Sequence, residues 1–513
     1  MGKSKSQRWT SFLISALLAS PLLGAAGRPA KKAGDLSWKP YTLETAQGEK
    51  VAAELGTLVV PESRKRPDGR LVELSFVRLK SLSANPGPPI VYLAGGPGGS
   101  GIDAARGVRY PVFAALRQVA DVIALDQRGV GLSAHILMLC RESWFYPVDR
   151  PGERGEMIAL AQSHSQSCSE FLTRNGFDVA AYNNDESADD LEDLRLALGA
   201  PRLSLWGVSY GTSLGLTALR RHPQSFHRAV LAGVEGPGQG LRLPSDVQGL
   251  LERIDGLVRT DPGTREAVPD FLGLVRSVLG RLETRPATVE VSDSMAQRKV
   301  PVTVGRFDLQ MMTAQALASS EGIRRLPGDY LRMSQGDFSP LAEFVYRRRK
   351  GWLGQAMPYL VDCSQGTPPE RLARIDQEEK KMLLGRVADF PYPEICKGWG
   401  LAAPGPETWA PVRSQVPALL ISGSLDGRTP PRNAEEVAQG LPNAVQLLVE
   451  GAGHGDDLLV SSPAIAEAMV AFLRGGKPAT GRIALGPFHF QPVPSPAKPA
   501  AAAQRKSISS KVP

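Results

Sequence analysis

The chain has few cysteines, and it lacks the patterns that would hold a zinc ion or a nucleotide. None of the four cysteines among its 513 residues are spaced as Cys-x-x-Cys, so a structural zinc site is not expected. The glycine-rich run at 95–101 is not followed by Lys-Ser or Lys-Thr, which excludes a phosphate-binding loop of that type. We therefore expect neither a metal ion nor a cofactor.

Acidic residues are absent from both ends of the chain, and this absence explains the net charge of +8. Residues 1–26 carry three basic side chains and residues 477–513 carry six, which leaves a net charge of −1 for residues 27–476. A nucleic-acid-binding domain would carry its basic charge on the folded surface. We expect no nucleic-acid partner.

No apolar run near the N-terminus is long and continuous enough to predict a membrane span. After basic residues that end at Arg8, an apolar stretch from Phe12 to about Ala26 is interrupted by serine and proline and ends in small residues. This pattern is typical of a secretory signal peptide, and an uncleaved amphipathic anchor is the alternative. We expect a periplasmic or secreted protein that is not stably inserted in a membrane after cleavage.

Short apolar runs bounded by glycine or proline alternate with helical patterns along most of the chain. Such runs are typical of buried strands, and their alternation with helices predicts an α/β fold with a mostly parallel, doubly wound sheet. The predicted strands are 55–60, 71–79, 90–93, 122–125, 203–206, 229–231, 418–421 and 445–449, and the predicted helices between them are 185–198, 213–221, 432–439 and 463–474.

One long stretch interrupts this alternation, and its pattern is mainly helical with a hairpin around 289–304. We predict a cap domain inserted over the carboxyl ends of the strands. The end of the chain is rich in Pro, Ala, Lys and Ser, a composition typical of disorder. The predicted division is signal peptide 1–26, first part of the core 37–237, mainly helical cap 238–410, second part of the core 411–475 and disordered basic tail 476–513.

A serine lies in a glycine-flanked turn directly after a predicted strand. In Gly207–Gly211 this residue is Ser209, and the two glycines leave room for the strained strand-to-helix turn of a nucleophilic serine. Asp426 follows a later strand, and His454 lies between glycines after the next one. Ser, Asp, His is the chain order of the α/β-hydrolase triad. We predict that Ser209 attacks the substrate, His454 transfers the proton and Asp426 orients His454.

The tetrahedral intermediate of such a reaction needs backbone donors for its oxyanion. The N–H group of Tyr210 lies at the start of the predicted nucleophile helix. The glycine-rich run after strand 90–93 lets its backbone approach a substrate closely. We predict an oxyanion hole made by Tyr210 together with Gly95 or Gly96.

Four glycine-containing motifs carry a family resemblance, and they are Gly95–Gly99, Asp126–Gly131, Gly207–Gly211 and Gly451–Gly455. Together they resemble the prolyl-iminopeptidase group of α/β-hydrolases, above all its exported branch of tripeptidyl-aminopeptidase-like enzymes. The resemblance spans about residues 50–475. It implies a serine hydrolase that trims peptides and holds their free α-amino group with carboxylates.

The resemblance makes two carboxylates candidates for binding the amine. Members of this branch are expected to have an acid two positions after the first cysteine of the cap, where this chain has Gln365. Glu235, which follows a predicted strand, is the first candidate, and Asp362, which precedes Cys363, is the second.

The cysteines fall into two pairs, one on each side of the nucleophile along the chain. An oxidising compartment favours disulfides, with four free buried thiols as the alternative. Three connectivities are possible. We predict nearest-neighbour pairing, Cys140 with Cys168 and Cys363 with Cys396.

Three functions remain open from the sequence. The leading one is an exported aminopeptidase that releases N-terminal residues or short peptides through an acyl-enzyme on Ser209. The second is a carboxylesterase or amidase acting on small acyl substrates, since acyl transfer to serine is common to both. The third is a catalytically inactive hydrolase fold used for binding. The expected partner is a peptide or a small ester or amide, and we expect a monomer.

Overall fold

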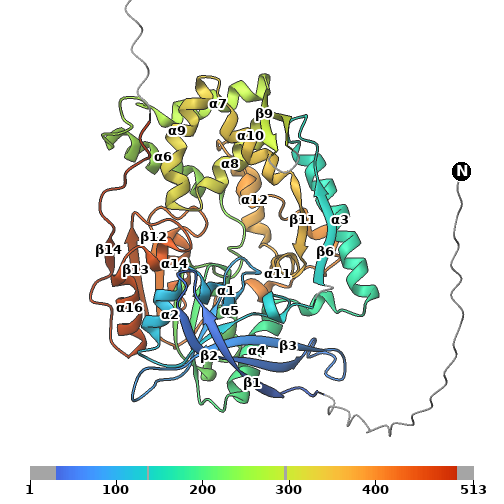
Figure 1. Ribbon diagram of the computed structural model, residues 1–513, viewed down its shortest axis with the longest axis vertical. Coiled ribbons are helices and arrows are strands. Elements are labelled where there is room, and N and C mark those ends of the chain that lie inside the picture. Colours follow the sequence, from blue (N-terminus) through green and yellow to red (C-terminus); the bar gives the residue numbers. More distant parts are fainter. Residues whose placement is uncertain (1–30, 136–137, 294–296, 494–513) are drawn as a thin grey trace, which may run out of the picture.

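The computed structural model describes residues 31–135, 138–293 and 297–493 (Figure 1). The predicted signal peptide therefore lies outside the described residues. Within these ranges, no helix combines the length and the apolar character needed to cross a membrane.

A ten-stranded sheet forms the centre of the described structure, in the order β1-β2-β3-β5-β4-β7-β8-β12-β13-β14. The pairs from β1 to β5 across β2 and β3 are antiparallel, and every pair from β5 to β14 is parallel. The prediction of a mostly parallel α/β sheet is confirmed. The strands are β1 (Leu36–Glu44), β2 (Lys50–Pro61), β3 (Leu71–Leu79), β4 (Ile90–Leu93), β5 (Val122–Leu125), β7 (Leu203–Val208), β8 (Phe226–Ala232), β12 (Ala418–Gly423), β13 (Ala444–Glu450) and β14 (Arg482–Ala484).

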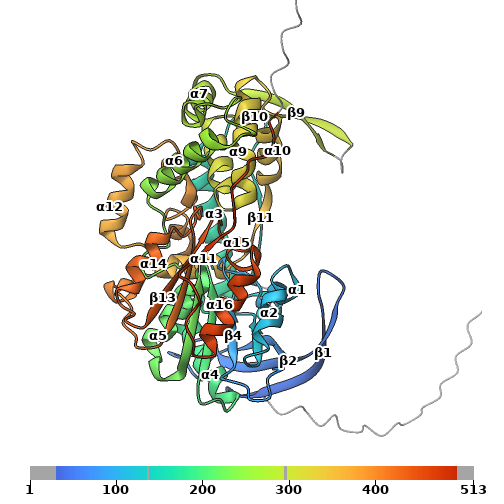
Figure 2. The same cartoon turned by 90° about the vertical axis from the view of Figure 1, so that its left-hand side faces the viewer.

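Both faces of this sheet are covered, which explains why the short central strands β4 and β5 are apolar along their whole length. Along β4, Val91 and Leu93 face one hydrophobic core, while Ile90 and Tyr92 face the other. Side chains alternate between the faces of a strand, so a strand buried on both sides has no polar face. Figure 2 shows the two helical layers. One contains α4 (Asn184–Ala197), α5 (Tyr210–Arg221) and α14 (Pro431–Ala438), and the other contains α1 (Gly101–Arg106), α2 (Tyr110–Leu116) and α16 (Pro463–Leu473).

A third hydrophobic core belongs to the helices that lie above the sheet in Figure 1. The predicted hairpin is present as two antiparallel strands. The division of the chain into core and cap at the stated residues stays a prediction. The elements of this region are α6 (Pro244–Thr260), α7 (Phe271–Thr284), β9 (Ala287–Asp293), β10 (Arg298–Val304), α8 (Arg306–Ala316), α9 (Ser320–Ser334), α10 (Ser339–Arg348) and α12 (Pro369–Glu378).

Part of the chain that precedes the nucleophile packs against these later elements. β6 (Leu139–Phe145) pairs antiparallel with β11 (Lys350–Gln355). α3 (Arg154–Arg174) lies against α13 (Cys396–Trp399), which was not expected from the order of the segments along the chain. The segment around β6 and α3 thus ties these later elements to one face of the sheet, because Cys140 and Cys168 belong to the same hydrophobic cluster as Leu205 of β7.

Both predicted disulfides are present. Cys140–Cys168 joins β6 to α3, and Cys363–Cys396 joins α11 (Met357–Gln365) to α13. The described residues contain no free cysteine.

Loss of either disulfide is expected to lower the free energy of unfolding by about 3–4 kcal/mol, because each closes a loop of about 30 residues in the unfolded chain. The sequence separations are 28 and 33 residues, so the two losses should be similar. Denaturant unfolding of the Cys140→Ser/Cys168→Ser and Cys363→Ser/Cys396→Ser variants would measure the difference. Peptide mapping without reduction that joined Cys140 or Cys168 to the later pair would contradict the connectivity.

The predicted disordered tail is structured as far as Val493, so that prediction is wrong for residues 477–493. β14 adds a parallel strand to β13, and Phe490 enters the upper hydrophobic core. The guanidinium of Arg324 in α9 donates to the carbonyl of His489. The prediction rested on the high proline and alanine content of the whole tail, whereas the order depends on a few apolar residues such as Ile483 and Phe490. Residues 494–513 lie outside the described part of the chain.

Candidate active site

The predicted nucleophile, Ser209, lies where the strand order reverses. β4 and β7 are neighbours, but the chain continues from β4 to β5 on one side and from β7 to β8 on the other. The loops after β4 and β7 therefore diverge at the carboxyl edge of the sheet and leave a crevice, which is the usual ligand site of such sheets. The first loop carries Gly95 and Gly96, and the second carries Ser209.

Ser209 has a backbone conformation that few residues other than glycine adopt, with φ 55° and ψ −128°. The turn is tight because the chain passes from the buried end of β7 directly into α5. Its neighbours must be glycine, since an ideal Cβ at Gly207 would lie 2.5 Å from the carbonyl oxygen of Gly211. A Cβ at Gly211 would lie 2.0 Å from the carbonyl oxygen of Leu93. The strain of the turn is thus held by close backbone packing.

Gly211→Ala is expected to lower the free energy of unfolding by at least about 3 kcal/mol, the upper end of the usual range for overpacking, because the added methyl group would overlap rigid backbone. The variant should also lose its activity. Gly249→Ala is the matched control, since a Cβ at this position in α6 meets nothing within 4 Å. Thermal unfolding and hydrolase activity of the two variants would be compared. Wild-type stability of Gly211→Ala would contradict the geometry of the turn.

The three residues predicted as a triad come together in the order their roles require. His454 Nε2 lies 2.9 Å from Ser209 Oγ, and His454 Nδ1 lies 2.8 Å from Asp426 Oδ2. Burial by itself would raise the pKa of Asp426, but the charge and hydrogen bond of His454, with hydrogen bonds from Thr429, hold that pKa below its usual value. Asp426 is therefore an ionised acceptor for the imidazole at neutral pH.

Thr429 is a residue that the sequence reasoning missed. Its hydroxyl donates to Asp426 Oδ2 at 2.8 Å and lies 3.1 Å from His454 Nδ1. The backbone N–H groups of Arg428 and Thr429 both donate to Asp426 Oδ1, at 2.7 and 2.8 Å. These bonds fix the carboxylate and the loop around it. The signal in the sequence was the turn-forming Asp-Gly pair followed by a threonine within hydrogen-bonding reach.

The residues predicted for the oxyanion hole lie beside the serine. An ideal Cβ at Gly95 would lie 2.8 Å from Ser209 Cβ, so the backbone there approaches the nucleophile as closely as glycine allows. Gly96 has φ 123°, a conformation open to glycine. Tyr210 begins α5, and its buried hydroxyl donates to Asn184. The backbone N–H groups of this region remain our proposed oxyanion donors.

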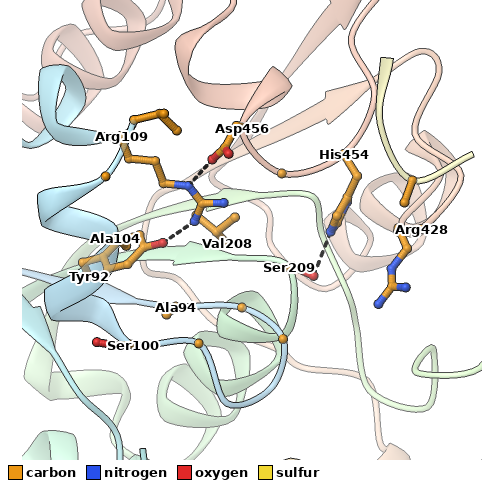
Figure 3. Close-up of a pocket in the computed structure, with 17 residues that line it drawn as sticks. Tyr92, Ala94, Ser100, Ala104, Arg109, Val208, Ser209, Arg428, His454 and Asp456 are labelled. Atoms are coloured by element: carbon orange, nitrogen blue, oxygen red, sulfur yellow. Dashed lines mark hydrogen bonds and ion pairs between the residues drawn. The ribbon is translucent and has the colours of Figure 1, made fainter. Parts of the chain in front are cut away.

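A cleft of about 530 Å³ opens over one side of the triad and is drawn in Figure 3. In its wall, the guanidinium of Arg109 bridges the hydroxyl of Tyr92 and the carboxylate of Asp456. His454 points to Ser209 across the floor, and Arg428 lies beyond His454. This cleft is one of two spaces that adjoin Ser209.

A second cavity of about 170 Å³ adjoins the other side of Ser209 and is called the lateral cavity here. Its wall is unusually rich in charge for a space of this size. Glu235 and Asp362 are predicted from the sequence as alternative candidates for binding the amine, whereas the structure brings both together. The charged or titratable side chains that line it are those of Glu235, Arg242, Asp362, Asp389, Tyr392 and Arg428.

Glu235 is anchored against the nucleophile turn. Its backbone N–H donates to Thr212 Oγ1 at 2.8 Å, and the Thr212 hydroxyl donates to the carbonyl of Ser209 at 2.6 Å. The carboxylate makes no hydrogen bond or ion pair within the described part of the chain, and it lines the lateral cavity. Burial raises its pKa.

Asp362 faces the same cavity from α11. Burial, followed by the charge of Glu235, raises the pKa of Asp362 to about 8, although a hydrogen bond from Tyr392 acts in the opposite direction. Asp362 is thus mostly protonated at neutral pH, which relieves the repulsion between the two carboxylates. Across the described residues, no cluster of histidine, cysteine or acidic side chains could hold a metal ion.

Comparisons with known proteins identify a family and several relatives. The model of the alpha/beta hydrolase fold family matches residues 88–456. The serine protease Hip1 of Mycobacterium tuberculosis is 24% identical over 91% of this chain and 95% of its own length. The tripeptidyl aminopeptidase of Streptomyces lividans is 31% identical over 36% of each chain. A solved serine hydrolase, CCSP0084 of Cycloclasticus zankles, is 14% identical over 82% of this chain and 98% of its own, with a TM-score of 0.34.

The matched range of the family model contains the serine turn, the acid and the histidine, and the resemblance to tripeptidyl-aminopeptidase-like hydrolases is confirmed by the relatives. This chain belongs to the alpha/beta hydrolase fold family, and it is a serine hydrolase.

Proposed function

We propose that the protein is an exported aminopeptidase that releases one N-terminal residue at a time, with Ser209, His454 and Asp426 as its catalytic triad. The observation that carries the proposal is the unpaired carboxylate of Glu235 in the cavity that adjoins Ser209. A buried charge without a partner is costly, so a cation from the substrate is the expected complement. The α-ammonium group of a peptide is such a cation.

The size of the lateral cavity supports release of a single residue. Glu235 and Ser209 line the same space of about 170 Å³, and one threonine links their backbones. An ammonium group bound by Glu235 is therefore close to the carbonyl that Ser209 attacks. The relatives named as a protease and an aminopeptidase support peptide chemistry.

The proposed reaction runs through an acyl-enzyme. Ser209 Oγ attacks the first carbonyl carbon of the peptide while His454 Nε2 accepts the hydroxyl proton. The N–H groups of Tyr210 and of Gly95 or Gly96 stabilise the oxyanion. His454 then protonates the leaving amine, and a water molecule activated by His454 releases the N-terminal residue from the serine.

Export is proposed on two grounds. The basic and then apolar pattern of residues 1–26 is that of a signal peptide. The two disulfides are typical of an oxidising compartment such as the periplasm or the extracellular medium. The monomeric state stays a prediction.

A matched panel of chromogenic substrates tests the activity. The wild-type enzyme is expected to hydrolyse Ala-p-nitroanilide with a higher kcat/KM than either N-acetyl-Ala-p-nitroanilide or Ala-Ala-Ala-p-nitroanilide. Preference for the acetylated compound or for simple esters would overturn the aminopeptidase proposal in favour of an esterase or amidase. Preference for the tripeptide compound would overturn the release of single residues.

A further inference from the structure

One cation in the lateral cavity, Arg428, has no partner among the described residues. The guanidinium of Arg428 donates no hydrogen bond and forms no ion pair with any residue that the structure describes, and its side chain is exposed to the cavity. The neighbouring Arg242 is paired, with its Nε 2.8 Å from Asp389 Oδ1. The cavity thus contains one committed arginine and one that is free to bind an anion.

The position of Arg428 is fixed relative to the reacting atoms. Its backbone N–H donates to Asp426, two residues away, in the turn that holds the triad acid. Its side chain lines both the lateral cavity and the cleft over His454, as Figure 3 shows for the cleft. A substrate residue next to the scissile bond would occupy these spaces, so an anionic group on that residue would lie near the guanidinium of Arg428.

Arg242 and Arg428 repel each other in this cavity, although three nearby carboxylates partly offset the repulsion. The charge of Arg242, followed by burial, lowers the pKa of Arg428 to about 10, so it remains a cation at neutral pH. Binding of an anion would relieve this repulsion. The planar guanidinium matches a carboxylate in particular, since it can donate two parallel hydrogen bonds.

The cavity also keeps opposite charges apart. Glu235 and Arg428 attract each other but form no ion pair in the described structure, and both face the same space as Ser209. This arrangement complements a ligand that carries an ammonium and a carboxylate on one residue. An N-terminal glutamate or aspartate is such a residue.

We propose that Arg428 binds the side-chain carboxylate of an acidic N-terminal residue, so that the enzyme prefers peptides that begin with glutamate or aspartate. This inference rests on the proposed aminopeptidase activity. Arg428 acts here as a specificity-determining residue, while Glu235 holds the ammonium group.

The test compares α-Glu-p-nitroanilide with its neutral isostere Gln-p-nitroanilide. The wild-type kcat/KM is expected to favour the glutamyl compound by about 10- to 150-fold, the range of a hydrogen-bonded charge. Arg428→Gln should bring the ratio close to one, and Arg428→Lys should keep part of it because a point charge remains. Arg413→Gln is the matched control, since this exposed arginine lines neither cavity and its loss should leave the ratio at the wild-type value.

The test uses the ratio of kcat/KM for the glutamyl and glutaminyl substrates because Arg428 lies beside Asp426. A substitution there that lowers turnover of all substrates equally leaves this ratio unchanged. An independent measurement on the wild type is inhibition by free L-glutamate, which should occur at a concentration at least tenfold below that for L-glutamine. Equal inhibition, or a wild-type ratio near one, would overturn the proposal. So would an unchanged ratio in Arg428→Gln.

Two further pairs of substrates separate the remaining outcomes. The first pair is Ala-Ala and Ala-Ala-NH₂, which differ only in the C-terminal carboxylate of the leaving residue. If Ala-Ala is preferred, Arg428→Gln removes that preference and the Glu/Gln ratio is near one, then Arg428 binds the carboxylate of the leaving residue. The proposal is then wrong. The second pair is N-acetyl-Glu-p-nitroanilide and N-acetyl-Gln-p-nitroanilide, which lack a free amine. It tests whether Arg428 binds the carboxylate even if the enzyme is not an aminopeptidase. A glutamyl preference that persists there and depends on Arg428 would support carboxylate binding without an amine site.

Discussion

Ser209→Ala is expected to lower kcat by about 10⁶-fold, since the loss of a triad nucleophile typically has this effect. Asp426→Asn should lower it by about 10⁴-fold, because an amide would favour the wrong tautomer of His454. The effects of the two changes should not add in the double variant, since the residues act as a unit. Steady-state kinetics on the best substrate of the panel would measure all three losses.

Covalent labelling provides a second readout for the same residues. A fluorophosphonate is expected to label Ser209 in the wild type and to leave Ser209→Ala unlabelled. Ser461→Ala is a suitable control, because this exposed serine lies after α15 (Asp457–Val460) and outside both cavities. Undiminished turnover by purified Ser209→Ala would refute the assignment of the nucleophile.

Glu235→Gln is expected to weaken the use of free-amine substrates by about 2–5 kcal/mol, that is about 30- to 5,000-fold in kcat/KM. The reason is that the ammonium group would be buried without its partner. The same variant should hydrolyse N-acetylated substrates as the wild type does. Comparing kcat/KM for the free-amine and acetylated forms of one substrate separates amine binding from structural damage.

Asp362→Asn tests whether the second carboxylate of the lateral cavity also binds the amine. With its pKa raised to about 8, Asp362 is mostly neutral at pH 7, so its replacement should cost less there than that of Glu235. Glu467→Gln, an exposed change on α16, controls for the loss of one acid. Equal losses by Glu235→Gln on both substrate classes would mean that Glu235 has a structural role.

The strands and the serine turn could be predicted because short sequence patterns mark them, and the structure brings Ser209, His454 and Asp426 together as their order along the chain predicts. The buried run Ile90–Leu93 and the glycine-flanked serine turn at Gly207–Gly211 are both visible as short patterns in the sequence. The pairing of β6 with β11 could not be predicted, because the strands are about 200 residues apart and neither alternates clearly. Long-range pairing is set by the tertiary structure rather than by local propensity.

The lateral cavity was only partly predictable for the same reason. Glu235 and Asp362 were candidates by resemblance, but their common space with Arg428 depends on three segments that are distant in sequence. Arg428 itself gave no signal, since a single arginine in a turn is ordinary. Arg428 becomes a candidate for anion binding because its guanidinium has no hydrogen-bond or ion-pair partner among the described residues, and the sequence does not show this.

The ordered segment after residue 476 has a consequence for how substrates enter. It adds β14 to the sheet and then inserts Phe490 into the hydrophobic core above the sheet, so it crosses from one region to the other. We expect this additional connection to restrict hinge-like movement of the upper helices relative to the sheet. We therefore expect an entrance of nearly constant width, through which unstructured chain ends pass and folded proteins do not.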